Sequence, residues 1–149
     1  RKPNIITSLE LDPAEMEKRN IHLQQKYAEI EANEVRYEEI NCEDAEYLIV
    51  AFGSCARIAQ KTMELARAEG IKVGLLRPIT LWPFPSKAIA ERAKQVKGIL
   101  TVELNAGQMV EDVRLAVECK VPVEHFGRLG GIVPDPDEVV EALKTKLIK

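Results

Sequence analysis

From residue 44 onward, short apolar runs alternate with amphipathic segments, and this alternation constrains the fold more than any other feature. The first run, YLIVAFGS at 47–54, is continuously apolar and ends at Gly and Ser, which is typical of a strand buried on both faces. A helical pattern follows at 55–70, then a strand pattern at 71–78 and a helical pattern at 85–98. Strands separated by helices of this length favour a parallel sheet with right-handed crossovers.

The same order continues to the end of the chain. ILTVELN at 99–105 predicts a third strand, and the pattern at 107–120 predicts a helix. VPVEHFG at 121–127 predicts a shorter, more polar strand, and 134–148 a last helix. We therefore expect a three-layer α/β/α domain with a mostly parallel sheet over residues 44–149.

Residues 1–43 have a different pattern, typical of a charged linker segment. Asp12 is the expected N-cap and Pro13 the first residue of a long helix that reaches to about Ile40. A narrow apolar stripe runs along this helix, formed by Met16, Leu23, Tyr27 and Ile30. We expect the helix to pack on a neighbouring domain, with a dimer seam as the alternative.

Composition is that of an ordinary soluble domain and argues against two classes of function. The chain has 149 residues, 46% hydrophobic and 30% charged, with a net charge of −3 spread along its length. It has no basic stripe to neutralise phosphates, so nucleic-acid binding is not expected. No apolar run approaches the roughly 20 residues that span a bilayer, so no membrane contact is expected.

The cysteines and the first residue add two expectations. Cys42, Cys55 and Cys119 are odd in number and too far apart for a CxxC arrangement, so neither a zinc site, an iron–sulfur cluster nor a disulfide framework is expected. Reduced thiols indicate a cytoplasmic location. The chain begins with Arg1 and its start has no apolar targeting core, which suggests a piece of a longer chain.

Candidate functional residues lie where the predicted strands end, because ligands and partners of parallel sheets gather at that edge. Ser54 can cap the following helix, and the free amides of its first turn can hold an anion. A GxGxxG motif is missing, which argues against a dinucleotide site. Cys55 is expected to be inert. His22 and His125 have no neighbours at metal-ligand spacing.

Two further strand ends carry polar side chains. Glu103, Asn105 and Gln108 surround a turn at Gly107, and they either serve function or tie up loop backbone groups. Arg128 precedes a Gly-Gly pair and can reach an anionic partner group, although a surface ion pair is the commoner fate of an arginine.

The stretch LLRPITLWPFP at 75–85 predicts a rigid apolar loop. Pro78 ends its strand, and Pro83 and Pro85 stiffen the exit. Trp82 and Phe84 are costly to leave in water, so the loop is expected to be covered by the domain itself or by another chain. Either aromatic–proline bond is a candidate for the cis form.

Three stretches together resemble one family. They are KVGLLRPITLWPFP at 72–85, VELNAGQMVEDVRLAV at 102–117 and VEHFGRLGGIVPDPDEV at 123–139. As a set they are similar to the C-terminal part of the α subunit of thiamine-diphosphate-dependent 2-oxoacid:ferredoxin oxidoreductases of the 2-oxoglutarate and 2-oxoisovalerate types. The resemblance covers essentially the whole chain and implies a transketolase C-terminal-like domain.

The resemblance implies a complex that decarboxylates a 2-oxoacid, joins the acyl group to coenzyme A and passes electrons to ferredoxin. Thiamine diphosphate, Mg and iron–sulfur clusters would belong to the parent complex, together with β- and γ/δ-type subunits. No catalytic, cofactor-binding or metal-binding residue is expected in this chain, which should be inactive alone. The residues expected to form an interface or to frame the active site are Arg77, Trp82, Phe84, Glu103, Asn105, Gln108 and Arg128.

Two alternative functions remain open from the sequence. One is the C-terminal domain of a 2-oxoacid dehydrogenase E1-type chain, whose partner is an acyltransferase. The other is a stand-alone flavodoxin-like module that binds a nucleotide at Ser54.

Overall fold

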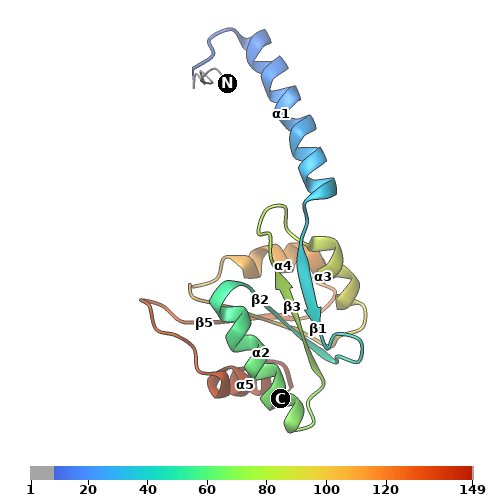
Figure 1. The fold of residues 1–149 in the computed structure, drawn as a ribbon, viewed down its shortest axis with the longest axis vertical. Helices are drawn as coiled ribbons and strands as arrows, with labels where there is room; N and C mark the ends of the chain where they lie inside the picture. Colours follow the sequence, from blue (N-terminus) through green and yellow to red (C-terminus); the bar gives the residue numbers. More distant parts are fainter. Residues whose placement is uncertain (1–8, 149) are drawn as a thin grey trace, which may run out of the picture. The chain divides into compact units, whose positions relative to one another are not determined.

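The computed structural model describes residues 9–148, and the chain divides into two units between Glu34 and Val35. The first unit contains helix α1 (Pro13–Asn33), which begins as predicted because the Asp12 carboxylate accepts hydrogen bonds from two backbone N–H groups of the first turn. The second unit contains a five-stranded sheet and its covering helices (Figure 1).

The expected extent of the first helix was wrong. Helix α1 ends at Asn33, and the segment predicted as its continuation forms strand β1 (Tyr37–Ile40). β1 pairs antiparallel with β3 (Val73–Pro78), whose free edge supplies hydrogen bonds that outweigh the weak local preference of YEEI. The second unit therefore begins at Val35, earlier than the expected boundary at residue 44.

The sheet has the strand order β1-β3-β2-β4-β5, and every pair except β1 with β3 is parallel. The remaining strands are β2 (Tyr47–Ala51), β4 (Ile99–Glu103) and β5 (Val123–Gly127). β2 lies in the middle, as expected for a run without a single polar position.

Helices cover both faces of the sheet, which confirms the three-layer α/β/α fold. Helices α2 (Gly53–Ala68) and α5 (Pro136–Leu143) lie together on one face. Helices α3 (Ser86–Ala93) and α4 (Met109–Val117) lie together on the other (Figure 1). A π-helical turn at Lys144–Ile148 follows α5, where the sequence predicted one continuous helix.

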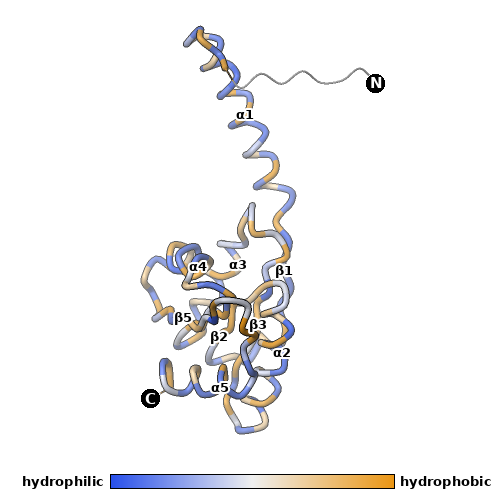
Figure 2. The backbone as a smooth tube through the Cα atoms, turned by 90° about the vertical axis from the view of Figure 1, so that its left-hand side faces the viewer, coloured by the Kyte–Doolittle hydropathy of each residue, from blue (hydrophilic) through white to orange (hydrophobic). Residues whose placement is uncertain are grey.

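Alternate residues of the strands fill two separate cores. Ile49 and Leu100 pack in the cluster that includes α2 and α5. Leu48 and Ile99 pack in the cluster that includes α3 and α4. Each is fully buried and contributes about 1.5–3 kcal/mol relative to an exposed side chain. Figure 2 shows orange, hydrophobic segments where β2 and β3 run, although β3 also contains Arg77.

Candidate functional site

The connections between strands place a topological switch point at the carboxyl ends of β2 and β4. From β2 the chain passes through α2 to β3, toward one side of the sheet, whereas from β4 it passes through α4 to β5, toward the other. Ligands of open α/β sheets bind at such a topological switch point. We call the start of α2 and the loops 79–85, 104–108 and 128–134 the carboxyl edge of the sheet.

Glu103, the last residue of β4, organises this edge. Its side chain is 1% exposed, and its carboxylate accepts hydrogen bonds from the backbone N–H groups of Gln108 (3.2 Å), Met109 (2.8 Å) and Val110 (3.1 Å). N–H groups at a helix start have no partner inside the helix, so the carboxylate caps α4 and meets the positive end of its dipole. The side chain of Gln108 makes no such cap and is exposed.

His125 of β5, for which no role was expected, lies against the same carboxylate. Its Nδ1 is 3.3 Å from Glu103 Oε2 and 3.2 Å from Thr101 Oγ1, and its Nε2 is 3.3 Å from the backbone oxygen of Asn105. These contacts hold the imidazole ring between the carboxylate and the backbone of the loop. His125 thereby links β5 to the β4–α4 loop, a pairing that sequence spacing alone does not reveal.

Glycine is required where β5 meets this loop. A Cβ atom on Gly127 would overlap the backbone oxygen of Asn105 and the ring of His125. Gly107 has φ +112°, and its N–H donates to the Asn105 side-chain oxygen at 2.7 Å. The structure thus brings Glu103, Asn105 and His125 together, largely as groups that hold loop backbone.

The start of α2 differs from the expected cap. The N-cap is Phe52, without a side-chain hydrogen bond, and the helix begins at Gly53 with φ +56°. Ser54 lies inside the first turn, past the capping position, so that prediction was wrong. Burial raises the pKa of the Cys55 thiol and the charge of Glu103 adds to the effect, so Cys55 is not an activated nucleophile.

The loop 79–85 is anchored at its base and apolar at its tip. Thr80 Oγ1 donates to the backbone oxygen of Pro83 at 2.9 Å. The Trp82–Pro83 bond is cis, as hypothesised, whereas Phe84–Pro85 is not. Phe84 packs partly buried against the core of α3 and α4, while Trp82 is 55% exposed. The two aromatic residues therefore face different surroundings.

Arg77 and Arg128 both lie at the carboxyl end of a strand, Arg77 in β3 and Arg128 directly after β5. Arg77 Nη1 donates to Glu38 at 2.8 Å, and Arg128 donates to Glu138. The side chains of both arginines are partly exposed, yet each has a buried Nε without a hydrogen-bond partner among the described residues. Strands β2 and β4 lie between them, so the structure does not bring the two arginines together.

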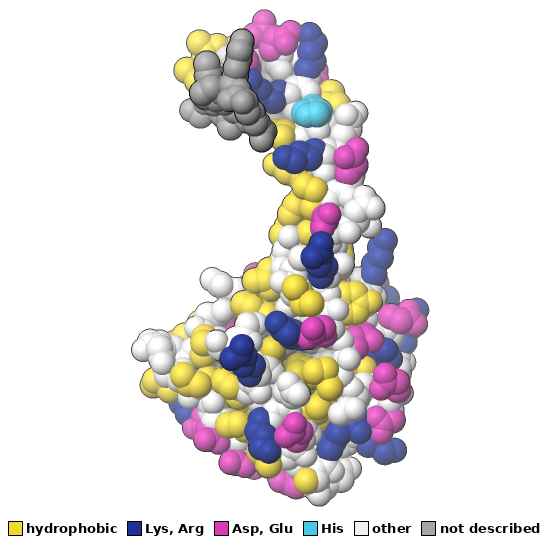
Figure 3. All heavy atoms as spheres, viewed as in Figure 1, with side chains coloured by type: hydrophobic (Ala, Val, Ile, Leu, Met, Phe, Trp, Pro, Cys, Tyr) yellow, Lys and Arg dark blue, Asp and Glu magenta, His cyan; other side chains and the backbone are white. Residues whose placement is uncertain are grey.

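Exposed large hydrophobic residues of the second unit are concentrated at the carboxyl edge. Each of the three loops contributes, and Figure 3 shows such side chains in yellow around the loop that follows β5. Neighbouring strands lie about 4.8 Å apart, so the loops after β3 and β5 are roughly 15 Å apart. The residues, which are 46–67% exposed, are Ile79, Leu81, Trp82, Leu104, Leu129, Ile132 and Val133. Clustered apolar exposure of this kind marks interaction surfaces.

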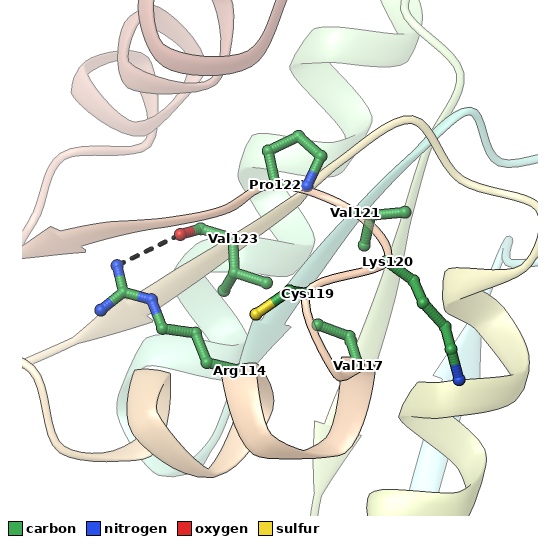
Figure 4. A pocket seen from close by; sticks show the side chains of 7 residues that line it. All are labelled: Arg114, Val117, Cys119, Lys120, Val121, Pro122 and Val123. Carbon is green, nitrogen blue, oxygen red and sulfur yellow. Dashed lines mark hydrogen bonds between the residues drawn. The ribbon is translucent and has the colours of Figure 1, made fainter.

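Hollows on the second unit include one toward each end of the sheet's strands. The larger, of about 350 Å³, lies at the amino end of β5, away from the carboxyl edge (Figure 4). There Cys119 points between Arg114 and Val117, and Arg114 donates to the backbone oxygen of Val123 at 3.2 Å. The smaller, of about 110 Å³, lies beside the start of α2.

Within residues 9–148, no three His, Cys, Asp or Glu side chains gather where they could hold a metal ion. In the same range no helix is long and apolar enough to cross a membrane. The carboxyl edge presents exposed apolar side chains around the Glu103 carboxylate that caps α4. The protein is a three-layer α/β domain. The connection from β2 to α2, at the switch point, has the single glycine Gly53 and lacks the glycine-rich motif that binds dinucleotides.

Residues 45–139 match the family described as pyruvate:ferredoxin oxidoreductase core domain II. The chain belongs to this family, and the relatives that it matches include subunits of ketoisovalerate oxidoreductases and of 2-oxoglutarate synthases.

Similarity to individual proteins agrees with this. The chain is 50% identical over 141 residues to ketoisovalerate oxidoreductase subunit VorB of Methanothermobacter thermautotrophicus. The aligned region covers 95% of this chain and 40% of that protein. It superposes with a TM-score of 0.77 and 25% identity on 2-oxoglutarate:ferredoxin oxidoreductase from Magnetococcus marinus, over 91% of this chain and 24% of that one. A split-gene transketolase shares the fold, with a TM-score of 0.65 and 21% identity over 76% of this chain and 41% of that one. The chain thus spans less than half the length of each.

Proposed function

We propose that the chain is the C-terminal domain of an α-type subunit of a thiamine-diphosphate-dependent 2-oxoacid:ferredoxin oxidoreductase. This cytoplasmic complex would convert a 2-oxoacid to an acyl-coenzyme A and reduce ferredoxin. The observation that carries the proposal is the 50% identity to a ketoisovalerate oxidoreductase subunit along 95% of the chain. The solved relative, a 2-oxoglutarate:ferredoxin oxidoreductase with 2-oxoglutarate, coenzyme A and succinyl-coenzyme A bound, supports the reaction class.

Within that complex the chain would assemble subunits and frame the active site, without catalysing a step. Thiamine diphosphate, Mg and the iron–sulfur clusters would be held by other parts of the complex. Cys55, the described thiol nearest the switch point, is buried and has a raised pKa. No reaction step is therefore assigned to a residue of this chain.

The carboxyl edge is the surface proposed to meet the β- and γ/δ-type subunits or the rest of the same subunit. Its support is the concentration of exposed apolar side chains, with Trp82 as the largest. Aromatic residues that are exposed on an isolated domain are typical anchors of interfaces. Arg77 and Arg128 would contribute to the same surface, each already held by a glutamate. Glu103, Asn105 and Gln108 would contribute by fixing the conformation of the loop between β4 and α4.

Affinity purification tests the proposal. The parent protein is tagged in its native cytoplasm, purified gently without oxygen, and its partners are identified by mass spectrometry. A thiamine-diphosphate subunit together with iron–sulfur subunits is expected. Recovery of an acyltransferase would instead place the chain in the 2-oxoacid dehydrogenases, and recovery of the protein alone would remove the assembly role.

A pair of variants tests the surface itself. Trp82→Ala in the parent protein is expected to weaken assembly by tenfold or more, about the effect of losing an interface hot spot, while leaving the melting temperature nearly unchanged. Leu115→Ala is the matched control, because Leu115 is an apolar side chain, 76% exposed, on helix α4. Equal effects of the two substitutions on assembly would argue against the carboxyl edge as the interface.

A further inference from the structure

The smaller hollow, beside the start of α2, is lined by residues of two strands and one helix, and two of these residues are arginines. It is about 110 Å³ in volume and is formed by one strand at the free edge, one neighbouring strand and the first two turns of a helix. Its lining residues are Glu38 and Ile40 of β1, Leu75 and Arg77 of β3, and Gly53, Ala56, Arg57 and Gln60 of α2.

The charges in this lining do not balance. The lining contains two guanidinium groups, those of Arg57 and Arg77, and one carboxylate, that of Glu38. Glu38 accepts a hydrogen bond from Arg77 Nη1 at 2.8 Å, and the buried Nε of Arg77 has no acceptor within the described part of the chain. Arg57 is exposed and has neither an ion pair nor a hydrogen bond to another described residue. The hollow therefore has an excess of one positive charge and several unused donors.

The shape and the chemistry of the lining fit a small oxyanion. Guanidinium groups present paired N–H donors that match phosphate oxygens, and two of them suit a doubly charged group better than a single carboxylate. One water occupies about 30 Å³ in the liquid, so the hollow has room for one phosphate group and not for a base or a ring system as well. Ile40, Ala56 and Leu75 form an apolar wall, which strengthens charge–charge attraction by excluding water.

We propose that this hollow binds a phosphate group between Arg57 and Arg77, with Glu38 holding Arg77 in place. The phosphate is either the free ion or the end of a larger molecule whose remainder lies outside the hollow. The inference goes beyond the proposed function, because it assigns a ligand to this chain and does not depend on any partner subunit.

Nuclear magnetic resonance titration of the ¹⁵N-labelled 149-residue chain with inorganic phosphate, at constant ionic strength, tests the site. The readout is the Nε–Hε signal of Arg77, which should shift and saturate. Arg57→Gln should weaken binding at least about tenfold, as expected for one charge-assisted hydrogen bond, and Arg57→Lys should restore part of the loss. Arg114→Gln, which removes the same charge from helix α4, is the matched control and should change affinity less than about twofold.

The outcomes are separable. Adenosine monophosphate that binds with the same dependence on Arg57 indicates a phosphate carried by a larger ligand, and binding of inorganic phosphate alone indicates the free ion. A shift of the Arg77 signal that does not saturate, or equal weakening by Arg57→Gln and Arg114→Gln, would overturn the proposal. Because the titration uses this chain alone, its failure would leave the assembly proposal untouched.

Discussion

Replacing Glu103 by Gln is the most informative single change in this domain. The substitution keeps the shape of the side chain but removes its charge and turns one acceptor into a donor. Glu103 Oε2 is the acceptor for Val110 N–H at 3.1 Å and lies 3.3 Å from His125 Nδ1. A glutamine that keeps Oε1 toward Met109 N–H would place its NH₂ group against the Val110 N–H donor and beside the His125 ring.

The size of the effect follows from the hydrogen bond between Val110 N–H and Oε2 that the substitution removes. One hydrogen bond to a charged group contributes about 1.5–3 kcal/mol, so the free energy of unfolding should decrease by about 1.5–3 kcal/mol for Glu103→Gln. For a domain of this size, 1 kcal/mol corresponds to roughly 3–4 °C in melting temperature, so a decrease of roughly 5–10 °C is expected.

Calorimetric melting and urea unfolding of two variants check this. The matched control is Glu111→Gln, because the Glu111 side chain lies exposed in the first turn of the same helix and makes no hydrogen bond or ion pair with another described residue. It should change the free energy of unfolding by about 0.5 kcal/mol at most. A decrease of less than about 1 kcal/mol for Glu103→Gln, or equal decreases for the two variants, would refute the cap.

Two further predictions concern thiols and acid. Under native conditions a thiol reagent should modify the exposed Cys119 rapidly and the buried Cys42 and Cys55 only as fast as the domain opens, because burial raises the pKa of both; rapid modification of all three would contradict the buried positions. The hydrogen bond from Arg67 lowers the pKa of the Asp44 carboxyl. The pair therefore stabilises the fold at pH values above the ordinary pKa of an aspartate, and this stabilisation is lost as the pH falls through the lowered pKa of Asp44. Wild type should therefore melt higher than Asp44→Asn at about pH 6, with the difference shrinking below about pH 4, as melting curves at several pH values would show.

The buried strands were predictable because their residue patterns match their final surroundings. Runs such as 47–51 are apolar at every position, which suits only a strand covered on both faces. The helix start at Asp12 was also predictable, since the capping carboxylate and the following proline act locally, and Asp135 caps α5 in the same way. From these elements the alternation alone leads to the three-layer fold.

Strand β1 was missed because its cause is not local. YEEI at Tyr37–Ile40 has little strand preference and continues a charged helical pattern, and only the free edge of β3 makes it a strand. His125 was missed for a similar reason, because its partners Glu103 and Asn105 are distant in sequence and meet it only when β4 and β5 pair. The candidate site was predictable as a set of strand ends, but its contacts were not.

Hydroxyl-radical footprinting with mass spectrometry tests most directly whether the carboxyl edge is an assembly surface. It compares the 149-residue chain alone with the parent protein in its purified complex, using Leu115 as an internal reference that is exposed away from the edge. We predict strong protection of Trp82, Leu104 and Ile132 in the complex and little change at Leu115. Equal labelling of Trp82 in both samples would contradict an assembly role for the carboxyl edge.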